Sequence, residues 1–264
     1  CEAMEPNQGG IILGKDNNWY FLTHHGTGDW SGRIVSLLPV TWVQDWPIPG
    51  EVLPQNIGTM KWDGKIPFKH TEKLSIKRSD DFDEDCLAPQ WQWNYQPRKD
   101  YFSLTERPGW LRLKAYRPLE TNNLLKAGNT LTQRTFRKQN NDVTIKMDIS
   151  NMQDGQKNGL CHFSSQHSAI GIVKEEDACY LEYRKNGNIT KGIQIHSEFV
   201  WFRTEWGMDG KSQYYYSLDG DNFLPFGEKY QLTWGNYRGD RIGIYCFNDK
   251  KETGSVDVDY CHYR

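Results

Sequence analysis

Acidic side chains crowd into two short stretches of the sequence, and paired carboxyl groups are what acid–base hydrolysis requires. Residues 80–85 read DDFDED, and Asp257 and Asp259 lie close to the last residue. An acid and a base that cleave a glycosidic bond with a water between them stand roughly 6.5 to 9.5 Å apart. Neighbouring residues of an extended segment point to opposite faces, so acids adjacent in sequence do not form such a pair. We interpret DDFDED as a solvated turn and assign no catalytic residue.

A second interpretation of these acids is a structural metal site. Asp81, Asp83 and Asp259 carry the hard carboxylate oxygens that Ca²⁺ prefers. They would meet if the first and last strands of their domain are neighbours. We therefore keep a structural Ca²⁺ at these three residues as the alternative to a solvated turn. No cofactor is expected for chemistry under either interpretation.

The nearest approach to a catalytic cluster is His24 and His25, which we place after the end of a strand, with Arg33 close behind. Adjacent histidines on a loop are more often solvent-exposed than functional. The sequence contains no Ser/His/Asp spacing, nucleophile elbow, phosphate loop or zinc signature. The residues alone thus predict no self-contained active site.

Composition excludes several classes of partner. The 264 residues hold 32 Lys and Arg against 34 Asp and Glu, a net charge of -2. Nucleic acids and anionic membranes select a concentrated basic surface, so we expect neither as a partner. No apolar run reaches the ~20 residues that span a bilayer, which favours a soluble protein. The six cysteines form no CxxC pair, and reduced buried thiols are favoured over a disulfide framework.

Strand-like alternation dominates residues 78–264. Val143, Ile145, Met147 and Ile149 alternate with polar residues, and Val256, Val258, Tyr260 and His262 repeat the pattern near the end of the chain. A period of two predicts strands with one dry and one wet face. No long helical stripe is present. The pattern predicts an all-β protein whose main domain is an antiparallel two-sheet sandwich.

Residues 1–66 carry four short apolar runs, which predict a four-stranded antiparallel unit. The runs are Ile11 to Leu13, Trp19 to Thr23, Arg33 to Leu37 and Val40 to Val43, with Pro39 separating the last two. Four strands in about 45 residues is the size of one propeller blade. A lone blade leaves its sheet faces uncovered, because propeller sheets pack against their neighbours. We expect the terminal part of a propeller here, with residues 67–77 as a linker.

Long motifs carry a family resemblance over nearly the whole chain. They include SDDFDEDCLAPQWQWNYQP, FSLTERPGWLRLKA, MDISNMQDGQKNGLCHF, YYYSLDGDNFLPFG and GDRIGIYCFN, with NQGGIILGKDNNWYFL and SGRIVSLLPVTWVQDWPIPG before them. These resemble the C-terminal β-sandwich and the last propeller portion of glycoside hydrolase family 43. The match is to its β-xylosidase and α-L-arabinofuranosidase branch. The resemblance implies a five-bladed propeller followed by a concanavalin-like jelly-roll sandwich.

The resemblance also implies a function and a few site residues. The family releases xylose or arabinose from hemicellulose by inverting hydrolysis, with an Asp, a second Asp and a Glu on earlier blades to which no segment here corresponds. Arg33 matches a sugar-contacting arginine at the pocket bottom. Asn7 stands where the family often has a metal- or water-binding histidine, and Gln8 follows it with a polar role.

Two partners and one alternative function follow from this likeness. The partners are a hemicellulose oligosaccharide and the missing propeller blades, on the same or a second polypeptide, and the chain alone is predicted to be inactive. The alternative is a non-catalytic carbohydrate-binding or structural sandwich. The compartment stays open, with the extracellular space and the periplasm considered.

Overall fold

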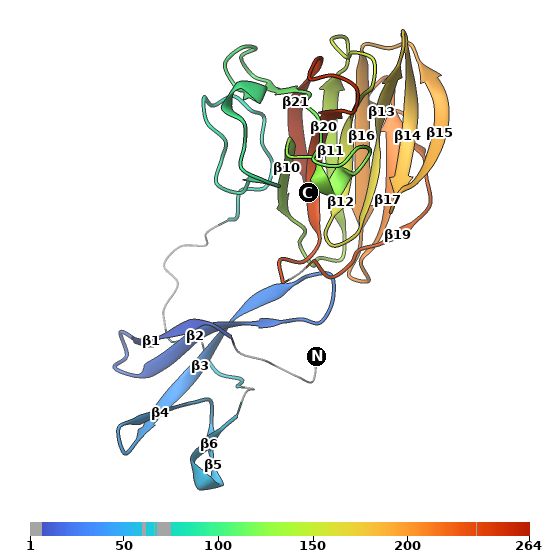
Figure 1. The fold of residues 1–264 in the computed structure, drawn as a ribbon. Coiled ribbons are helices and arrows are strands. Elements are labelled where there is room, and N and C mark those ends of the chain that lie inside the picture. The colour runs from blue at the N-terminus through green and yellow to red at the C-terminus, as the bar shows by residue number, and fades with distance from the viewer. Residues whose placement is uncertain (1–6, 60–61, 66, 68–74, 236) are drawn as a thin grey trace. The chain divides into compact units, whose positions relative to one another are not determined.

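The computed structural model describes residues 7–59, 62–65, 67, 75–235 and 237–264. The chain divides into two compact units, residues 1–76 and 77–264, and strands dominate both (Figure 1). The all-β fold that the alternation predicted is confirmed. Most of the expected linker lies outside the described residues. No helix among the described residues is long and apolar enough to cross a membrane.

The first unit contains a four-stranded antiparallel sheet in the order β1-β2-β3-β4. Its strands are β1 (Gly9–Leu13), β2 (Trp19–Gly26), β3 (Arg33–Val43) and β4 (Trp46–Pro49). A short pair follows, made of β5 (Val52–Leu53) and β6 (Ile57–Gly58), with the 3₁₀ turn η1 (Pro54–Asn56) between them. Sequential strands thus lie side by side, as in one blade of a propeller.

The prediction for the last strand of this sheet is wrong. Pro39 was expected to separate two strands, but β3 continues through it, and β4 supplies the fourth strand. Pro39 stays in the ladder opposite Tyr20 of β2, and its carbonyl accepts a hydrogen bond of 2.7 Å from the Gly50 amide. The chain reverses instead at Gln44 and Asp45, which both adopt positive φ.

The second unit is a sandwich of an eight-stranded and a seven-stranded antiparallel sheet. The eight-stranded sheet contains β18 (Leu224–Pro225), β17 (Lys211–Ser217), β16 (Phe199–Trp206), β11 (Asn141–Asp148), β21 (Ser255–Tyr263), β9 (Leu111–Lys114) and β8 (Phe102–Ser103), in this order, with β19 (Tyr230–Gln231) on β17.

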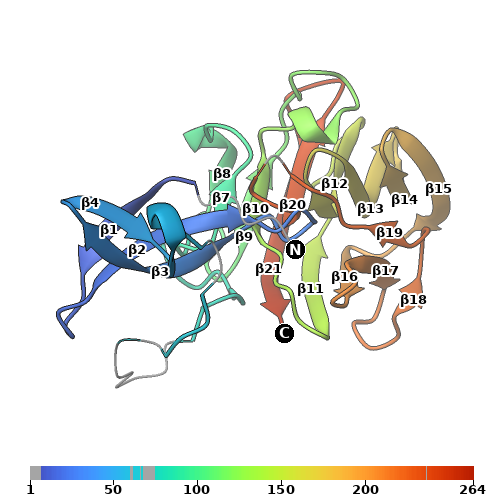
Figure 2. The ribbon, with the colours of Figure 1, turned by 90° about the horizontal axis from the view of Figure 1, so that it is seen from below.

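The seven-stranded sheet forms the other layer, and Figure 2 shows β12, β13 and β14 above β16 and β17. Its strands, in order, are β15 (Asn188–Ile195), β14 (Ala178–Lys185), β13 (His167–Glu175), β12 (Gln156–Phe163), β20 (Arg241–Asn248), β10 (Thr130–Arg134) and β7 (Gln92–Trp93). Two 3₁₀ turns, η2 (Lys99–Tyr101) and η3 (Leu124–Lys126), lie in the loops.

The core lies between the two sheets. Val143, Ile145 and Met147 of β11 are fully buried, which confirms the alternation predicted for this strand. Polar side chains bridge the layers inside this core: His162 of β12 lies 2.9 Å from Asp240 and 3.0 Å from the Thr204 hydroxyl of β16. The five cysteines within the described residues are free thiols, of which three are buried, as predicted, whereas Cys179 is half-buried and Cys86 is exposed.

Strand β21 carries a β-bulge. Lys146 of β11 pairs with Tyr260, and the next residue, Met147, pairs with Val258. Asp259 is therefore the extra residue on β21. A bulge of this kind twists the strand and redirects the side chains that follow it.

The bulge exchanges the two faces of β21. Val256 and Val258 are buried before it, and Cys261 and Tyr263 are buried after it. Strict alternation predicted that the dry face of Val256 would continue to His262, which is instead half-exposed. The expectation is wrong for the second half of the strand because one extra residue moves every following side chain to the opposite face.

Candidate functional site

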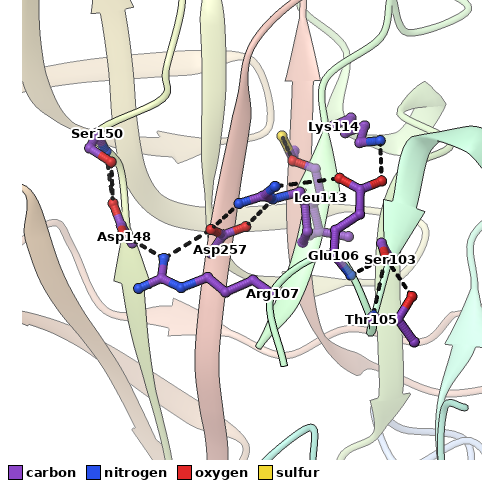
Figure 3. Close-up of polar contacts among 11 residues, drawn as sticks. Ser103, Thr105, Glu106, Arg107, Leu113, Lys114, Asp148, Ser150 and Asp257 are labelled. Atoms are coloured by element: carbon purple, nitrogen blue, oxygen red, sulfur yellow. Dashed lines mark hydrogen bonds and ion pairs between the residues drawn. The ribbon is translucent and has the colours of Figure 1, made fainter. Parts of the chain in front are cut away.

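The outer face of the eight-stranded sheet carries a network of ion pairs between the loop before β9 and strands β11 and β21 (Figure 3). Arg107 donates from Nη1 to Asp148 at 2.6 Å and to Asp257 at 2.9 Å. Arg112 of β9 donates to both oxygens of Asp257, at 2.7 and 2.8 Å. The Asp257 side chain is only 1% exposed. Two guanidinium groups thus neutralise one buried carboxylate.

The pKa values of Arg112 and Asp148 are both shifted toward the ionised form. Hydrogen bonding to Asp257 raises the pKa of Arg112. Burial raises the pKa of Asp148, but its hydrogen bonds with Ser150 and Arg107 outweigh that effect, and the net pKa is lowered. A carboxylate held this way is a poor proton acceptor. We therefore assign the network a structural role rather than acid–base chemistry.

The network also positions an aromatic side chain. The Arg107 guanidinium lies 3.7 Å from the centre of the Trp110 ring. Lys146 Nζ lies 5.2 Å from the same ring and 5.3 Å from Phe199. Cation–π contacts at these distances stabilise the rings against the sheet. The loop that carries Trp110 is therefore attached to the sheet by the ion pairs of Arg107 with β11 and β21 and by the contact of Lys146 with the Trp110 ring.

The structure brings the predicted sugar-contacting residues to one end of the four-stranded sheet. Arg33 is half-buried and begins β3 opposite Gly26, the last residue of β2. Asn7 donates from its backbone N to the His24 carbonyl at 3.0 Å. The Thr23 hydroxyl donates to the Asn7 carbonyl at 3.0 Å and to that of Gln8 at 3.3 Å. The sugar-binding roles of Arg33, Asn7 and Gln8 stay predictions.

His24 and His25 lie within β2 rather than after its end. The earlier placement on a loop is wrong because β2 pairs with β3 as far as Gly26. His25 is buried, and its Nδ1 is within hydrogen-bond distance of the Ser36 hydroxyl. It is thus engaged by a neighbouring strand of the same sheet.

The segments that carry the predicted calcium ligands are adjacent, since Asp80 forms an isolated bridge with Cys261. Asp81 nevertheless lies 2.8 Å from His262 Nε2, and Asp259 pairs with Lys146 at 2.7 Å. In the part of the chain that the structure describes, no three His, Cys, Asp or Glu side chains are grouped for a metal. Ca²⁺ binding by Asp81, Asp83 and Asp259 stays a prediction.

The interpretation of DDFDED as a solvated turn did not foresee Asp80. Asp81 and Asp83 are exposed, but Asp80 is buried, and it accepts hydrogen bonds from the Phe82 amide and from Trp91 Nε1, the latter at 2.8 Å. Nothing local distinguishes the first acid of such a run from the others. The sequence also offered no signal for the Arg107 network, whose members are up to 150 positions apart.

Comparisons with known proteins identify the family. Residues 79–264 match the family described as "Beta xylosidase C-terminal Concanavalin A-like domain". A β-xylosidase of Formosa agariphila is 34% identical over 281 residues, which covers 97% of this chain and 47% of that protein. A non-reducing end α-L-arabinofuranosidase of Bacteroides ovatus is 31% identical over 117 residues, 39% of this chain and 20% of that protein.

Solved structures agree with this match. A bifunctional GH43-CE protein of Bacteroides eggerthii superposes with a TM-score of 0.80 at 27% identity, over 98% of this chain and 34% of that one. The chain spans about half the length of the Formosa agariphila β-xylosidase that it resembles. The sandwich and the four-stranded sheet are thus both found in relatives. The chain belongs to glycoside hydrolase family 43, and residues 79–264 form its β-xylosidase-type concanavalin A-like domain.

Proposed function

We propose that this chain is the C-terminal portion of a hydrolase that releases xylose or arabinose from hemicellulose by single displacement with inversion. The observation that carries the proposal is the match of 97% of the chain, at 34% identity, to a β-xylosidase. The match to part of an arabinofuranosidase keeps arabinose as a second product. Because hemicellulose is a polymer found outside cells, the proposed compartment is extracellular or periplasmic.

In this proposal the catalytic carboxylates lie on propeller blades that this chain does not supply. Those blades belong to the same polypeptide or to a second one. The four-stranded sheet supports the need for them, because it exposes apolar side chains: Val35 is 74% exposed, Trp46 73% and Leu13 54%. Apolar patches of this kind mark surfaces that another element covers.

Arg33 is the residue of this chain that we propose to contact the sugar in the subsite before the cut. Guanidinium groups donate several hydrogen bonds in a fixed plane, which suits the vicinal hydroxyls of a pentose. Inversion requires a water between acid and base, with the two carboxyl groups roughly 6.5 to 9.5 Å apart. Asp148 and Asp257 both accept from the same nitrogen, Arg107 Nη1, at 2.6 and 2.9 Å, so these oxygens are too close together for that arrangement, and we give them no part in the step.

The test compares the chain alone with a fusion that places it behind the N-terminal half of the Formosa agariphila β-xylosidase. We expect the fusion to hydrolyse p-nitrophenyl β-xyloside or α-L-arabinofuranoside and the chain alone to release no nitrophenol above buffer. Proton NMR of the first product should show the inverted anomer. Hydrolysis by the chain alone would overturn the proposal, as would a retained anomer from the fusion.

A further inference from the structure

Three arginines gather at one end of the seven-stranded sheet. Arg241 is the first residue of β20, and its register partners are Arg134 on β10 and Phe163 on β12. Directly opposite residues of neighbouring strands point to the same face, so the two arginines share one face. Arg238 lies three residues before Arg241, in the loop that leads into β20. Because like charges directly opposite each other are destabilising, this end of the sheet carries an unfavourable concentration of positive charge.

Arg241 is the buried member of this arginine cluster. It is only 8% exposed, and its Nε donates to the Thr132 hydroxyl at 3.1 Å. A hydroxyl is a neutral acceptor and does not compensate the charge of a guanidinium group. Among the residues that the structure describes, neither Arg241 nor Arg238 forms an ion pair, and the arginine pairs present involve other arginines. A buried charge without a partner of opposite sign is strongly destabilising.

The nearest acid in the sequence faces the other way. Asp240 directly precedes Arg241, and successive residues of an extended segment point to opposite faces. Asp240 lies 2.9 Å from His162 Nδ1, in the core between the sheets, whereas Arg241 lies beside Phe163 on the outer face. Burial, together with Arg238 and Arg134, lowers the pKa of Arg241 from 12.5 to about 10. The surroundings of Arg241 thus oppose its positive charge.

Two other buried charges of this chain are compensated. Asp257 is paired with Arg107 and Arg112. Arg184 is 2% exposed and is paired with Glu182. The fold therefore neutralises buried charge at these sites with its own side chains. A buried guanidinium that lies beside two further arginines and has no acid of its own is expected where a bound anion supplies the missing charge.

The chemistry of arginine narrows the choice of anion. A planar guanidinium group binds the oxygens of a carboxylate or a phosphate with parallel hydrogen bonds. The chain as a whole has a net charge of -2, so it would repel an extended polyanion such as a nucleic acid beyond the cluster. A single charged group on an otherwise neutral molecule is the better match.

An exposed aromatic ring lies in the same loop. Tyr237 directly precedes Arg238 and is 58% exposed. Its ring centre lies 5.8 Å from that of Trp234, in an edge-to-face contact. A flat aromatic ring with one apolar face and one polar end can cover the apolar face of a sugar in water. A ring next to an arginine therefore suits a sugar that carries a carboxylate.

We infer that Arg238 and Arg241 bind the carboxylate of an acidic oligosaccharide, of the kind that uronic acid side groups give to hemicellulose. Arg134 adds to the positive potential at this site, and Tyr237 covers a sugar ring. The choice of hemicellulose rests on the proposed function, whereas the anion site rests on the buried charge of Arg241. The site lies on the sandwich, within the residues that carry the family match.

Isothermal titration of the 264-residue chain with a xylotriose that carries one glucuronic acid side group tests the inference. We expect saturable heat that weakens as NaCl is added, because salt screens the charges. Unsubstituted xylotriose should give none at the same concentrations. Arg241→Gln and Arg238→Gln should each weaken binding about tenfold, which corresponds to ~1.4 kcal/mol. Arg98→Gln is the matched control, because Arg98 is an exposed arginine paired with Glu252; it should leave the affinity unchanged.

Urea unfolding gives a second measurement that does not depend on the fold of Arg241→Gln. The acidic oligosaccharide should raise the unfolding midpoint of the parent chain by mass action. Arg238 is exposed, so Arg238→Gln should fold, and its midpoint should rise less. Without the oligosaccharide, Arg238→Gln should be at least as stable as the parent chain, since the change removes one like charge from the cluster.

Three results would overturn the inference. The first is equal binding of the acidic and the neutral xylotriose. The second is the absence of saturable heat with the acidic xylotriose, including the case in which sodium phosphate alone binds. The third is an unchanged affinity in both arginine variants. The measurements need no hydrolysis, so failure of the fusion to cleave an aryl glycoside and failure of this site to bind are separate outcomes.

Discussion

Asp257 and Arg112 form a two-bond ion pair across neighbouring strands, with Nε to Oδ1 at 2.7 Å and Nη2 to Oδ2 at 2.8 Å. Arg107 reaches the same carboxylate from the loop before β9. The two arginine side chains are 23% and 31% exposed, whereas the aspartate is 1% exposed. Asp257 is therefore the most buried member of the network, and it is an anion.

The first prediction concerns that anion. Asp257→Asn removes the charge that both arginines face, and we expect the free energy of unfolding to fall by about 2 kcal/mol, below the full cost of breaking a buried pair because the arginines still reach water. Urea denaturation at pH 7 measures the change. Asp259→Asn, which breaks the half-exposed pair with Lys146, should cost about 1 kcal/mol or less. Equal losses in the two variants would refute the central role of Asp257.

The second prediction is a pH dependence from His167, which is 7% exposed. Burial, with a contribution from Arg184, lowers the pKa of His167 from 6.5 to about 4. Below pH 6.5 the unfolded chain binds a proton here that the folded chain does not, so stability falls as the pH drops from about 6.5 to about 4. The loss amounts to ~3 kcal/mol at most.

His167→Gln should remove that part of the pH dependence. The measurement is the free energy of unfolding from urea titrations at pH 7.5 and 4.5, compared between the variant and the parent chain. His196→Gln, at an exposed position, serves as the control and should keep the parental slope. If His167→Gln also keeps the parental pH dependence, then the stability change comes from a titrating group other than His167.

The third prediction concerns a row of close contacts in the seven-stranded sheet. Gly171 pairs with Gly159, and Gly159 pairs with Tyr245 on its other side. A Cβ at Gly171 would lie 2.0 Å from the Asn158 carbonyl and 2.4 Å from the Tyr245 hydroxyl. The Asn158 carbonyl belongs to the backbone of β12 and cannot swing away as a side chain can. We therefore expect Gly171→Ala to lower the free energy of unfolding by about 3 kcal/mol.

Thermal or urea unfolding of Gly171→Ala checks this value. The comparison variant is Gly207→Ala, where the nearest atom would be the Gln139 carbonyl at 3.2 Å. That change should stay within about 1 kcal/mol of the parent. If Gly171→Ala is as stable as the parent chain, then β12 and β13 move apart more easily than the close contacts imply.

The fourth prediction applies to the fusion that tests the proposed function. Arg33→Ala should lower kcat/KM for the aryl glycoside by about 100-fold, because loss of hydrogen bonds from a charged donor removes ~3 kcal/mol of transition-state stabilisation. Arg33→Lys should recover only part of this, since an ammonium lacks the planar fork. Initial rates on both aryl glycosides measure the effect. Unchanged rates in Arg33→Ala would remove this residue from the pocket.

Local alternation was enough to predict the all-β fold and the dry face of β11. Val143, Ile145 and Met147 carry their own signal, because side chains of an extended strand alternate whatever strand lies beside it. The same alternation predicted the two-sheet sandwich, and four apolar runs predicted the four-stranded unit before it. The likeness of the long motifs to the family added the concanavalin-like form of the sandwich.

The bulge in β21 and the partners of the acidic side chains depend on pairing between strands that are distant in the sequence. The bulge at Asp259 depends on how β21 lies against β11, and it turned His262 outward against the local pattern. Asp257 is paired because Arg107 and Arg112 reach it from about 150 positions away, whereas the Asp142 carboxylate accepts a 3.4 Å hydrogen bond from the hydroxyl of Thr144, two residues along the same strand. An acidic residue looks the same in each case along the chain, since its charge is neutralised only by whatever side chain the neighbouring strand brings within hydrogen-bond distance.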